Sequence, residues 1–322
     1  MKSIKSANIT DGLRILVRCD LDVPLEDGRI QDTFRLDHVL PTLKYIVEAG
    51  GFPIIFGHLG RPKGEVKPEL SSSHLKPYFD KHLGEDKYEL LENLRFGSRE
   101  RSNDASYAKE LAKMAEMYVN ESFGNSHREH TSIVGVPKLL PSFAGIRLME
   151  EVEVLSKVLK NPDKPLIAIV GGAKIETKRP VLEKFAEIAD EVLVGGRIGI
   201  DMDAPLRGHM HLPIDYADDQ LDIGLKSCAL FEKTILKAKT IVWSGPMGKF
   251  EDEKFALGTK KVAEAVVASK AHSIVGGGDI LAALRAVGLL GKMSFVSTGG
   301  GAMLEFLVKG NLPGLEVLGY DG

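Results

Sequence analysis

Short apolar runs alternate with stretches of helical spacing along the whole chain. In the first half RILVRCDLDV, GFPIIFGHLG, YELLENLRF and AEMYVNESFG indicate strands, and FRLDHVLPTLKYIVEAG and LSSSHLKPYFDKHLG have the spacing of amphipathic helices. In the second half PLIAIVGGAK, DEVLVGG, KTIVWSG, HSIVGGG and SFVSTGGG indicate strands, separated by helical stretches such as TKRPVLEKFAEIAD and KFALGTKKVAEAVVASK. Strands that alternate with helices form parallel sheets. The pattern predicts an α/β protein with two doubly wound, Rossmann-like parallel sheets.

The two halves are separated by an amphipathic stretch, MEEVEVLSKVLKNPDKP, at residues 149–165. A chain of 322 residues is long for one hydrophobic core and suits two domains. We therefore predict a first domain over residues 1–148, an interdomain helix over 149–165 and a second domain over 166–304.

Two segments near the end of the chain, His272–Leu284 and Ser294–Leu307, share one pattern. Each has an apolar run, three glycines and then a run of helical character. Glycines let backbone N–H groups turn outward, and a helix start adds unpaired donors and the positive end of the helix dipole. Plain structural turns also contain GGG, but two such units in succession would place both loops at one sheet edge. They predict a phosphate site.

Four arginines fall where predicted strands end or a predicted helix begins: Arg61, Arg95, Arg128 and Arg35. Ligands of open α/β sheets bind beyond the carboxyl ends of strands, so at least three of these guanidiniums should converge on one crevice. Such a cluster favours a phosphate or carboxylate, whereas isolated surface arginines would be solvated. His58, just before Arg61, is interpreted as an anion donor rather than a core residue or a metal ligand.

Other polar residues bear on metals and phosphates. His127 and His130 lack the HEXXH order and a third nearby ligand, which disfavours zinc. Lys174 and Lys178 can share one helix face behind a Gly-Gly turn, where a cation requires an anionic ligand to offset the helix dipole. Asp279, directly after GGG, is interpreted either as a Mg²⁺ contact or as a helix N-cap.

Composition narrows the class of protein. The net charge is -3, with 42 basic and 45 acidic side chains, which disfavours nucleic-acid and membrane partners. Cys19 and Cys228 lie far apart with no metal-ligand spacing, as is typical of a reducing compartment. The start, MKSIKSANIT, lacks the apolar core of a signal peptide. We expect a soluble, cytoplasmic protein.

Eight stretches together resemble the phosphoglycerate kinase family: RCDLDVP, GHLGRPKG, LLENLRF, YVNESFGNSHREHTSIVGV, GGAKIETK, TIVWSGPMGKFEDEKFALGT, VGGGDILAA and STGGGAMLEFL. They span nearly the whole chain in the family's order. The resemblance implies reversible phosphoryl transfer between ATP and the carboxylate of 3-phosphoglycerate, giving ADP and 1,3-bisphosphoglycerate. It also implies Mg²⁺ as cofactor, a monomer, and a hinge to which the last residues, 305–322, contribute by returning to the first domain.

By motif position the resemblance implies roles for particular residues. The phosphoglycerate-binding residues are Asp20, Asp22, Arg35, His58, Arg61, Arg95 and Arg128. The nucleotide-binding residues are Gly172, Ala173, Lys174, Lys178, Gly195, Gly224, Pro246, Glu251, Gly276, Gly277, Gly278 and Asp279, with Glu251 at the ribose and Asp279 at the metal. Arg35, Lys174, Gly278 and Gly301 are the expected catalytic groups. Because the nucleophile is an ionised carboxylate, catalysis requires alignment and charge stabilisation rather than a general base.

The chain departs from the family pattern at four positions near the expected ligands. Asp22, Ser244 and Ile280 stand where the family carries Asn, Asn and Thr, and Arg197 replaces a glycine. In addition, the segment 197–225 is several dozen residues shorter than in typical members of the family. In those members the segment forms part of the adenine pocket. A catalytically impaired relative that binds phosphometabolites or nucleotide is therefore an alternative. A nicotinamide dehydrogenase is disfavoured, because Leu281 and Leu304 replace the last glycine of GxGxxG.

Overall fold

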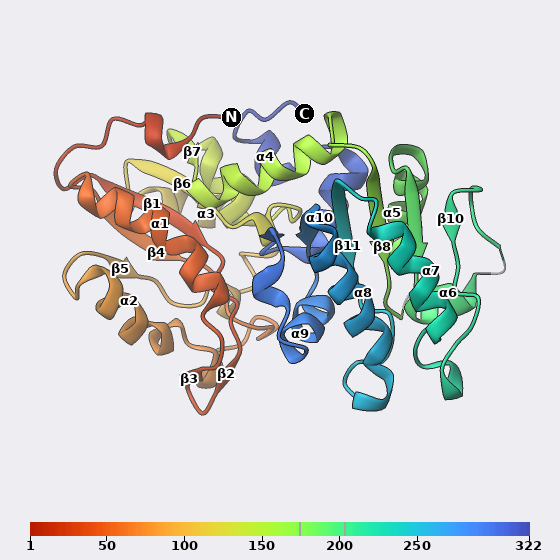
Figure 1. The fold of residues 1–322 in the computed structure, drawn as a ribbon. Coiled ribbons are helices and arrows are strands. Elements are labelled where there is room, and N and C mark those ends of the chain that lie inside the picture. Colours follow the sequence, from red (N-terminus) through yellow and green to blue (C-terminus); the bar gives the residue numbers. More distant parts are fainter. Residues whose placement is uncertain (174, 203) are drawn as a thin grey trace. The chain divides into compact units, whose positions relative to one another are not determined.

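The computed structural model describes residues 1–173, 175–202 and 204–322, and they form two compact units (Figure 1). Unit 1 contains Met1–Val154 together with Asn311–Gly322, and unit 2 contains Leu155–Gly310. The chain passes from the first unit to the second within α4 (Ile146–Lys160). Lys174 and Asp203 lie outside the described residues, so the predicted catalytic role of Lys174 stays a prediction.

Unit 1 is built on a parallel sheet with strand order β5-β4-β1-β6-β7. Its strands are β1 (Arg14–Cys19), β4 (Phe52–Phe56), β5 (Glu89–Leu90), β6 (Met117–Glu121) and β7 (Ser142–Ala144), and β2 (Leu25–Glu26) and β3 (Arg29–Ile30) form a separate hairpin. Its helices are α1 (Phe34–Glu48), α2 (Lys76–Leu83), α3 (Ala105–Ala112), the start of α4, and α11 (Pro313–Glu316). The shorter helical turns are η1 (Ile4–Ser6), η2 (Pro68–Leu70), η3 (Ser72–Leu75), η4 (Leu94–Phe96), η5 (Phe123–Asn125), η6 (Thr131–Gly135) and η7 (Val136–Lys138).

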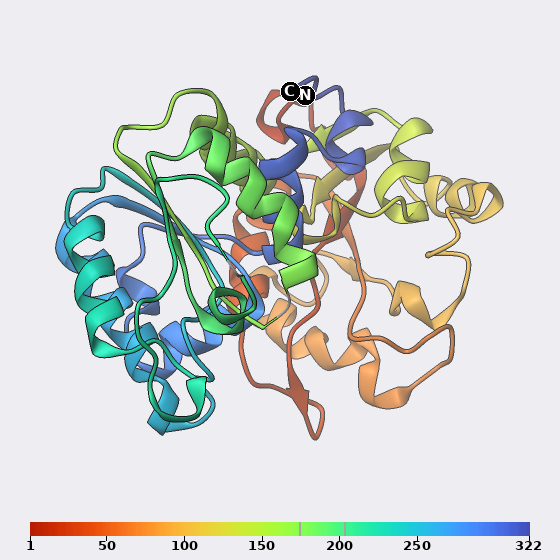
Figure 2. The same ribbon diagram turned by 90° about the vertical axis from the view of Figure 1, so that its right-hand side faces the viewer.

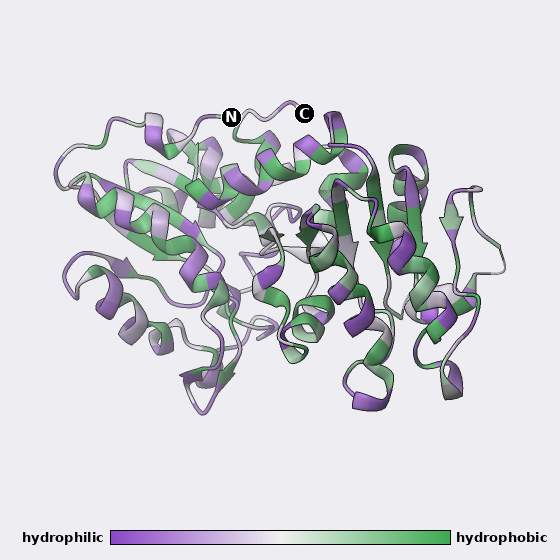
Figure 3. Ribbon diagram, viewed as in Figure 1, coloured by the Kyte–Doolittle hydropathy of each residue, from purple (hydrophilic) through white to green (hydrophobic). Residues whose placement is uncertain are grey.

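Both faces of the unit 1 sheet are buried. Successive side chains of a strand point to opposite faces, and in β1 the side chains on both faces are buried. On one face Ile15, Val17 and Val119 belong to a core cluster that includes the apolar face of α1. On the other face Leu16 and Arg18 are fully buried. Strands covered on both sides have continuous apolar sequences, which explains runs such as ILV and FPIIF. Figure 3 shows these strands as largely hydrophobic ribbons.

Unit 2 is built on a second parallel sheet with strand order β10-β9-β8-β11-β12-β13. Its strands are β8 (Leu166–Val170), β9 (Glu191–Val194), β10 (Met210–His211), β11 (Thr240–Ser244), β12 (His272–Val275) and β13 (Phe295–Val296). Its helices are the end of α4, α5 (Ile175–Ile188), α6 (Gly196–Asp201), α7 (Leu225–Ile235), α8 (Leu257–Ser269), α9 (Gly278–Ala286) and α10 (Gly300–Lys309), with the short turns η8 (Asp218–Gln220), η9 (Glu253–Phe255) and η10 (Leu290–Lys292).

The core of unit 2 is centred on β11. Ile241 and Trp243 are fully buried in a cluster with Phe231 of α7 and Val262 of α8. The buried indole N–H of Trp243 is satisfied, because it donates to the backbone oxygen of Gly245 at 2.9 Å. The two sheets thus match the predicted fold class: both are parallel and helices cover them.

Several elements differ from the predicted pattern. The run YELLENLRF yields only the two-residue β5 and then η4, because Asn93 turns the chain by accepting a hydrogen bond from the backbone N–H of Arg95 at 3.1 Å. The edge strands β7 and β10 and the β2–β3 hairpin were not predicted from the sequence, since they are too short to carry a periodic signal. The interpretation of Asp279 as an N-cap is wrong, because Gly277 is the N-cap of α9. No helix within the described ranges has both the length and the apolar character needed to cross a membrane.

The last residues of the chain belong to unit 1. Leu312 and Leu315 are buried there, and the backbone N–H of Gly314 donates to the backbone oxygen of Ser126 at 2.8 Å. The amino group of Met1 donates to the backbone oxygen of Gly319 at 2.6 Å, and Figure 2 shows the two chain ends side by side. Unit 1 is therefore assembled from two segments that are far apart in the sequence.

Candidate active site

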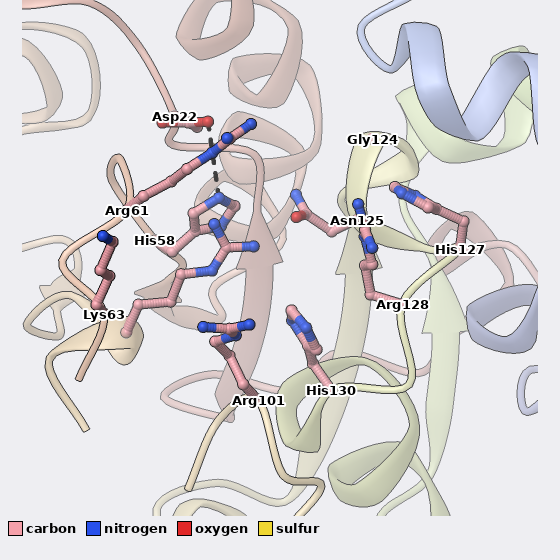
Figure 4. Close-up of a pocket in the computed structure, with 11 residues that line it drawn as sticks. Asp22, His58, Arg61, Lys63, Arg101, Gly124, Asn125, His127, Arg128 and His130 are labelled. Atoms are coloured by element: carbon pink, nitrogen blue, oxygen red, sulfur yellow. Dashed lines mark ion pairs between the residues drawn. The ribbon is translucent and has the colours of Figure 1, made fainter. Parts of the chain in front are cut away.

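In unit 1 the loops after β1, β4, β5 and β6 surround a cavity of about 480 Å³. The cavity is lined by Asp22, His58, Arg61, Lys63, Arg95, Arg101, Gly124, Asn125, His127, Arg128 and His130 (Figure 4). Strands β1 and β6 are neighbours in the sheet, and the strand order runs outward from them in both directions. Such a switch point leaves a crevice at the carboxyl edge of a parallel sheet, which explains the position of the cavity.

The cavity is strongly cationic. Three of the four arginines singled out in the sequence line it, Arg61, Arg95 and Arg128, together with Lys63 and Arg101, which the sequence analysis missed. In the part of the chain that the structure describes, no carboxylate forms an ion pair with any of these five side chains. Burial, with Arg18 nearby, lowers the pKa of Arg95 to about 10, which still leaves it charged at neutral pH. The cavity is therefore suited to a small, highly charged anion.

Arg35 and Asp20 lie outside the lining of this cavity. The guanidinium of Arg35 donates to the backbone oxygen of Asp22 at 2.6 Å and forms ion pairs with the carboxylates of Asp20 at 3.5 Å and Asp22 at 3.4 Å. Asp20 raises the pKa of Arg35 further, burial opposes this, and Asp22 adds to the increase. Arg35 is thus held at the end of β1 by two acidic residues while a third of its side chain stays exposed.

Asp22, which stands where the family carries Asn, has its own partners. One carboxylate oxygen accepts the backbone N–H of Gly60 at 2.7 Å, and the other lies 3.7 Å from Nε2 of His58. Burial would raise the pKa of Asp22, but the contact with His58, the Gly60 N–H and Arg35 hold it below its ordinary range. The carboxylate is therefore accommodated in the folded chain despite the acidic ligand expected nearby.

Two histidines of the cavity, His58 and His130, are neutral at pH 7. Burial lowers the pKa of His58 to about 4; the Asp22 carboxylate opposes this shift, and Arg18 and Arg95 add to it. Burial, followed by the charges of Arg95 and Arg18, lowers the pKa of His130 to about 3. Over the described residues no group of three His, Cys, Asp or Glu side chains could hold a metal ion.

In unit 2 the loops after β8, β9 and β11, the start of α9 and residues near η8 line a second cavity, of about 300 Å³. Its lining is Gly172, Ala173, Gly196, Arg197, Gln220, Leu221, Pro246, Gly248, Lys249, Phe250, Glu251 and Asp279. Strands β8 and β11 are the neighbours from which this strand order runs outward, so the cavity again lies at a switch point. Of the predicted nucleotide-binding residues it contains Gly172, Ala173, Pro246, Glu251 and Asp279.

The glycines of these loops permit close backbone approach. A Cβ built on Gly300, at the start of α10, would lie 2.3 Å from Cα of Gly277. The two GGG loops therefore lie against each other at the sheet edge, and two helices begin there. A Cβ built on Gly245 would lie 2.1 Å from the backbone oxygen of Gly171. Side chains at these positions would push the loops apart, so the strand ends require glycine.

Lys178 lies in the first turn of α5 and is mostly buried. Its ammonium donates to Oγ of Ser244 at 2.8 Å. Burial lowers the pKa of Lys178 to about 8, and the negative charge of Asp279 opposes this shift. Ser244, which departs from the family's Asn, thus supplies a partner that holds Lys178 near Asp279.

The structure also shows where the remaining departures from the family pattern lie. Ile280 is fully buried in the core of unit 2, so the position presents no hydroxyl group to a ligand. Arg197 lines the cavity and forms an ion pair with Asp201 at 2.8 Å along α6. Gly224 and Leu225 lie at the start of α7 and do not line the cavity, and Leu225 is 66% exposed. Gln220, Leu221 and Phe250 line it without having been predicted, because no motif marks a base-binding surface.

Comparison with known proteins identifies the family. The phosphoglycerate kinase family model matches residues 4–89, 81–204 and 207–310. A phosphoglycerate kinase of Leptospira biflexa is 37% identical over 384 positions, which cover 95% of this chain and 96% of the relative. One of Finegoldia magna is 36% identical, covering 98% of both chains. The solved structure of phosphoglycerate kinase from Coxiella burnetii has a TM-score of 0.88 and 33% identity, covering 98% of each chain.

The same comparison locates part of the shortening. The alignment with the Leptospira biflexa relative is 384 positions long, more than the 322 residues of this chain, so the relative contains dozens of residues that are absent here. The family match is interrupted at 204–207, inside the segment 197–225 that the sequence analysis identified as short. Both parallel sheets are retained nonetheless. From its sequence and its fold, the chain belongs to the phosphoglycerate kinase family, whose members transfer a phosphoryl group reversibly between ATP and 3-phosphoglycerate.

Proposed function

We propose that this chain is an active phosphoglycerate kinase, with 3-phosphoglycerate bound in the cavity of unit 1 and ATP or ADP bound in the cavity of unit 2. The observation that carries the proposal is the set of five cationic side chains that line the unit 1 cavity without carboxylate partners among the described residues. Several cations held together without counterions favour a ligand with more than one negative charge. 3-Phosphoglycerate, with a carboxylate and a phosphate, has this character.

The acceptor is held by groups of two kinds. Arg61, Arg95 and Arg128 supply planar guanidiniums that can bind phosphate or carboxylate oxygens in pairs. His58, which is neutral, supplies a hydrogen-bond donor without adding charge. Arg35 and Asp20 belong to the same assignment, with Arg35 held in place by Asp20 and Asp22. 1,3-Bisphosphoglycerate, the acyl phosphate product, takes the same position.

The nucleotide is held mainly by backbone groups and helix starts. Gly172 and Ala173 precede α5, and the GGG loops at Gly276–Gly278 and at Gly299–Gly301 lead into α9 and α10, so N–H donors face the phosphates. Lys174 and Lys178 add positive charge, Glu251 binds the ribose, and Leu221 and Phe250 pack against the base. Lys174 enters by its motif position alone.

The donor groups fit Mg²⁺ bound through the nucleotide. Asp279 is a single carboxylate in the first turn of α9 that lines the cavity. Mg²⁺ in nucleotide sites takes one or two protein carboxylates and completes its octahedron with phosphate oxygens and water. Asp279 would therefore hold the ion, and the ion would neutralise charge on the phosphates when bound.

The reaction breaks the bond between the γ-phosphorus and the bridging oxygen of ATP and forms a bond from that phosphorus to a carboxylate oxygen of 3-phosphoglycerate. No proton moves, because the acceptor carboxylate is already ionised. Arg35 and Lys174 stabilise charge on the transferred group, and the N–H groups at Gly278 and Gly301 donate to its oxygens. Because donor and acceptor bind to different units, transfer requires a closed complex that aligns them and excludes water.

We further propose that the protein acts as a monomer in the cytoplasm. Each proposed ligand cavity is lined by residues of a single unit of this chain. Cys19 and Cys228 are both free and buried, as suits a reducing compartment.

A coupled assay tests the function directly. The full chain is supplied with 3-phosphoglycerate, ATP and Mg²⁺, and formation of 1,3-bisphosphoglycerate is followed by its reduction in a coupled step. We expect a turnover number of about 1 to 10³ s⁻¹, dependent on both substrates and abolished by a chelator. Calorimetric binding of both ligands without turnover would instead indicate the catalytically impaired relative.

A further inference from the structure

Arg18 is a fully buried arginine beneath the unit 1 cavity. It lies on β1, and the alternation of side chains places it on the face of the sheet shared with Leu16. Its Nε–H donates to Oγ of Ser132 at 2.9 Å, and its Nη1 donates to Oγ of Ser122 at 3.4 Å and to the backbone oxygen of Cys19. The guanidinium is therefore fixed on several sides.

Arg18 has one further contact, with His58. Its Nη2 lies 3.2 Å from Nδ1 of the His58 ring. A guanidinium has only donors and does not lose its proton in proteins, so Nδ1 must act as the acceptor. An imidazole whose Nδ1 accepts a hydrogen bond carries its proton on Nε2 when neutral. The contact thus selects one tautomer of His58.

A second observation agrees with this tautomer. Nε2 of His58 lies 3.7 Å from a carboxylate oxygen of Asp22, which has no proton to donate. A protonated Nε2 is attracted to this oxygen, whereas a lone pair on Nε2 would be repelled. The two sides of the ring, Arg18 at Nδ1 and Asp22 at Nε2, therefore favour the same state. Figure 4 shows the contact between His58 and Asp22.

The position of Arg18 is set by a buried acidic residue. Oγ of Ser132 accepts from Arg18 and donates to Glu100 at 2.6 Å, while the Ser132 backbone N–H donates to the other oxygen of Glu100 at 3.0 Å. Glu100 is fully buried, so Ser132 rather than water hydrogen-bonds its carboxylate, while burial raises its pKa and the charge of Arg18 opposes that shift. This arrangement forms a continuous hydrogen-bonded chain from Glu100 through Ser132 and Arg18 to His58.

We propose that Arg18 is a positioning residue that fixes His58 as the neutral Nε2–H tautomer, so that His58 presents an uncharged hydrogen-bond donor to the bound anion. This inference rests on the proposed function only in taking that anion to be 3-phosphoglycerate. The charged and titratable groups that face His58 are Arg18, Arg95, Asp22 and His130, and burial together with the two arginines lowers its pKa to about 4. His58 therefore keeps one protonation state from about pH 5 upward, and its contribution to acceptor binding is constant over that range.

The first test is the ¹⁵N spectrum of the imidazole rings in the full-length wild-type protein without ligand. The His58 signals are assigned by their loss in His58→Gln. We expect an unprotonated Nδ1 and a protonated Nε2, with no titration between pH 5.5 and 8. An Nδ1–H tautomer, or a titration midpoint between pH 6 and 7, would overturn the proposal.

The second test compares Arg18→Met with Arg14→Met, which removes a half-exposed arginine of the same strand that pairs with Glu89. Arg18→Met removes the donor at Nδ1, so the ¹⁵N signals of His58 should show a mixture of both neutral tautomers. The His58 midpoint should also rise above its wild-type value, although burial and Arg95 still hold it below the ordinary range. Arg14→Met should change neither. If Arg18→Met retains the pure Nε2–H tautomer, Arg18 does not have this role. If Arg18→Met fails to fold, the wild-type spectrum decides.

Addition of 3-phosphoglycerate separates this inference from the proposed function. A shift of the His58 Nε2 signal on titration supports both. The expected tautomer without any ligand-induced shift would retain the role of Arg18 and overturn the placement of the acceptor.

Discussion

The two cavities recognise anions by different means. In unit 1 the positive charge is carried by side chains such as Arg61 and Arg101, which extend from loops into the cavity without ion-pair partners among the described residues. In unit 2 the lining is rich in glycine, and the cations in it are Lys249 and Arg197, which is paired with Asp201. Lys178 lies outside this lining, where its ammonium donates to Ser244. Side-chain recognition depends on which residues are present, whereas backbone recognition depends on which side chains are absent. Substitutions should therefore affect the two cavities differently.

The largest effect is expected at the residues assigned to the transferred group. Arg35→Ala should lower kcat by about 10³-fold or more, a far larger effect than its effect on folding, because it removes charge stabilisation of the kind an arginine finger provides. Lys174→Ala should lower kcat to a similar extent, an expectation that rests on the motif position of Lys174. Steady-state kinetics and thermal melts are the measurements, with Arg207→Ala, an exposed arginine of unit 2, as the control. A near-normal kcat in either variant would contradict the assigned roles.

The next effect concerns the cationic cavity alone. Arg61→Ala should raise the KM for 3-phosphoglycerate by about 10- to 100-fold, the range of a lost hydrogen bond to a charged group. The KM for ATP should stay within twofold. Arg99→Ala is the matched control, because Arg99 is paired with Glu110 on the surface and does not line the cavity. Equal changes in both KM values would mean that the cavities are not separate in function.

In unit 2 we expect a dependence on pH. Burial lowers the pKa of Lys178 to about 8, so the ammonium loses its proton as the pH rises through that value. The nucleotide phosphates favour the charged form, and the KM for ATP should therefore rise up to about tenfold between pH 7 and 9.5. Lys178→Met should abolish that rise. An unchanged KM across this range in the wild type would show that Lys178 does not contact the phosphates.

Base selectivity should be weak. The phosphates are held by the glycine loops, whereas the base meets a short apolar surface at Leu221 and Phe250 next to the shortened segment. A partial wall contacts ATP and GTP alike, so kcat/KM should favour ATP by less than about tenfold. Assays with both nucleotides measure the ratio. A strong preference would assign base recognition to a polar group of the lining, and Gln220→Ala would then identify it.

The smallest effect is expected from Asp22→Asn. The asparagine oxygen can still accept the N–H of Gly60, while one negative charge leaves the rim of the cavity. 3-Phosphoglycerate should bind about fivefold more tightly, or about 1 kcal/mol, as measured by calorimetry. Weaker binding would mean that Asp22 orients Arg35 or His58 more than it repels the ligand.

The same variant has an opposite effect on folding. Because the pKa of Asp22 is held below its ordinary value, its carboxylate stabilises the folded chain above that value, and this contribution is lost as the pH falls. Asp22→Asn should therefore be less stable than wild type at pH 7, with the difference shrinking in acid. Urea unfolding of the variant and the wild type, at pH 7 and in acid, measures the difference in the free energy of unfolding.

Much of this organisation could be predicted from the sequence, because it depends on local patterns. Apolar runs followed by glycines give the strands and loops of both sheets, and the position of Arg61, Arg95 and Arg128 after strands was sufficient to bring them together. Lys63 could have been found by the same reasoning, since it follows Arg61 by two residues in GRPKG.

Other features depend on contacts that no local pattern carries. Arg18 interrupts an apolar strand, and its burial follows from Ser132 and Glu100, more than 80 residues away in the sequence. Gln220, Leu221 and Phe250 line the second cavity because the chain is folded around η8, with no motif to mark them. The partners of Asp22 were also hidden, because Gly60 and His58 reach it only when β1 and β4 pair.

Leu312 and Leu315 are buried in unit 1, most of which comes from Met1–Val154. The core of unit 1 is therefore completed only after all of unit 2 has been synthesised. During synthesis, the strands of the acceptor-binding unit emerge before these two leucines and cannot bury them until residues 312–315 have also emerged. The nucleotide-binding unit, in contrast, is one continuous segment ending at Gly310 and can fold while the last residues are still being added. The unit that binds 3-phosphoglycerate is thus completed after the nucleotide-binding unit. Premature termination shortly after Gly310 would leave the nucleotide-binding unit intact.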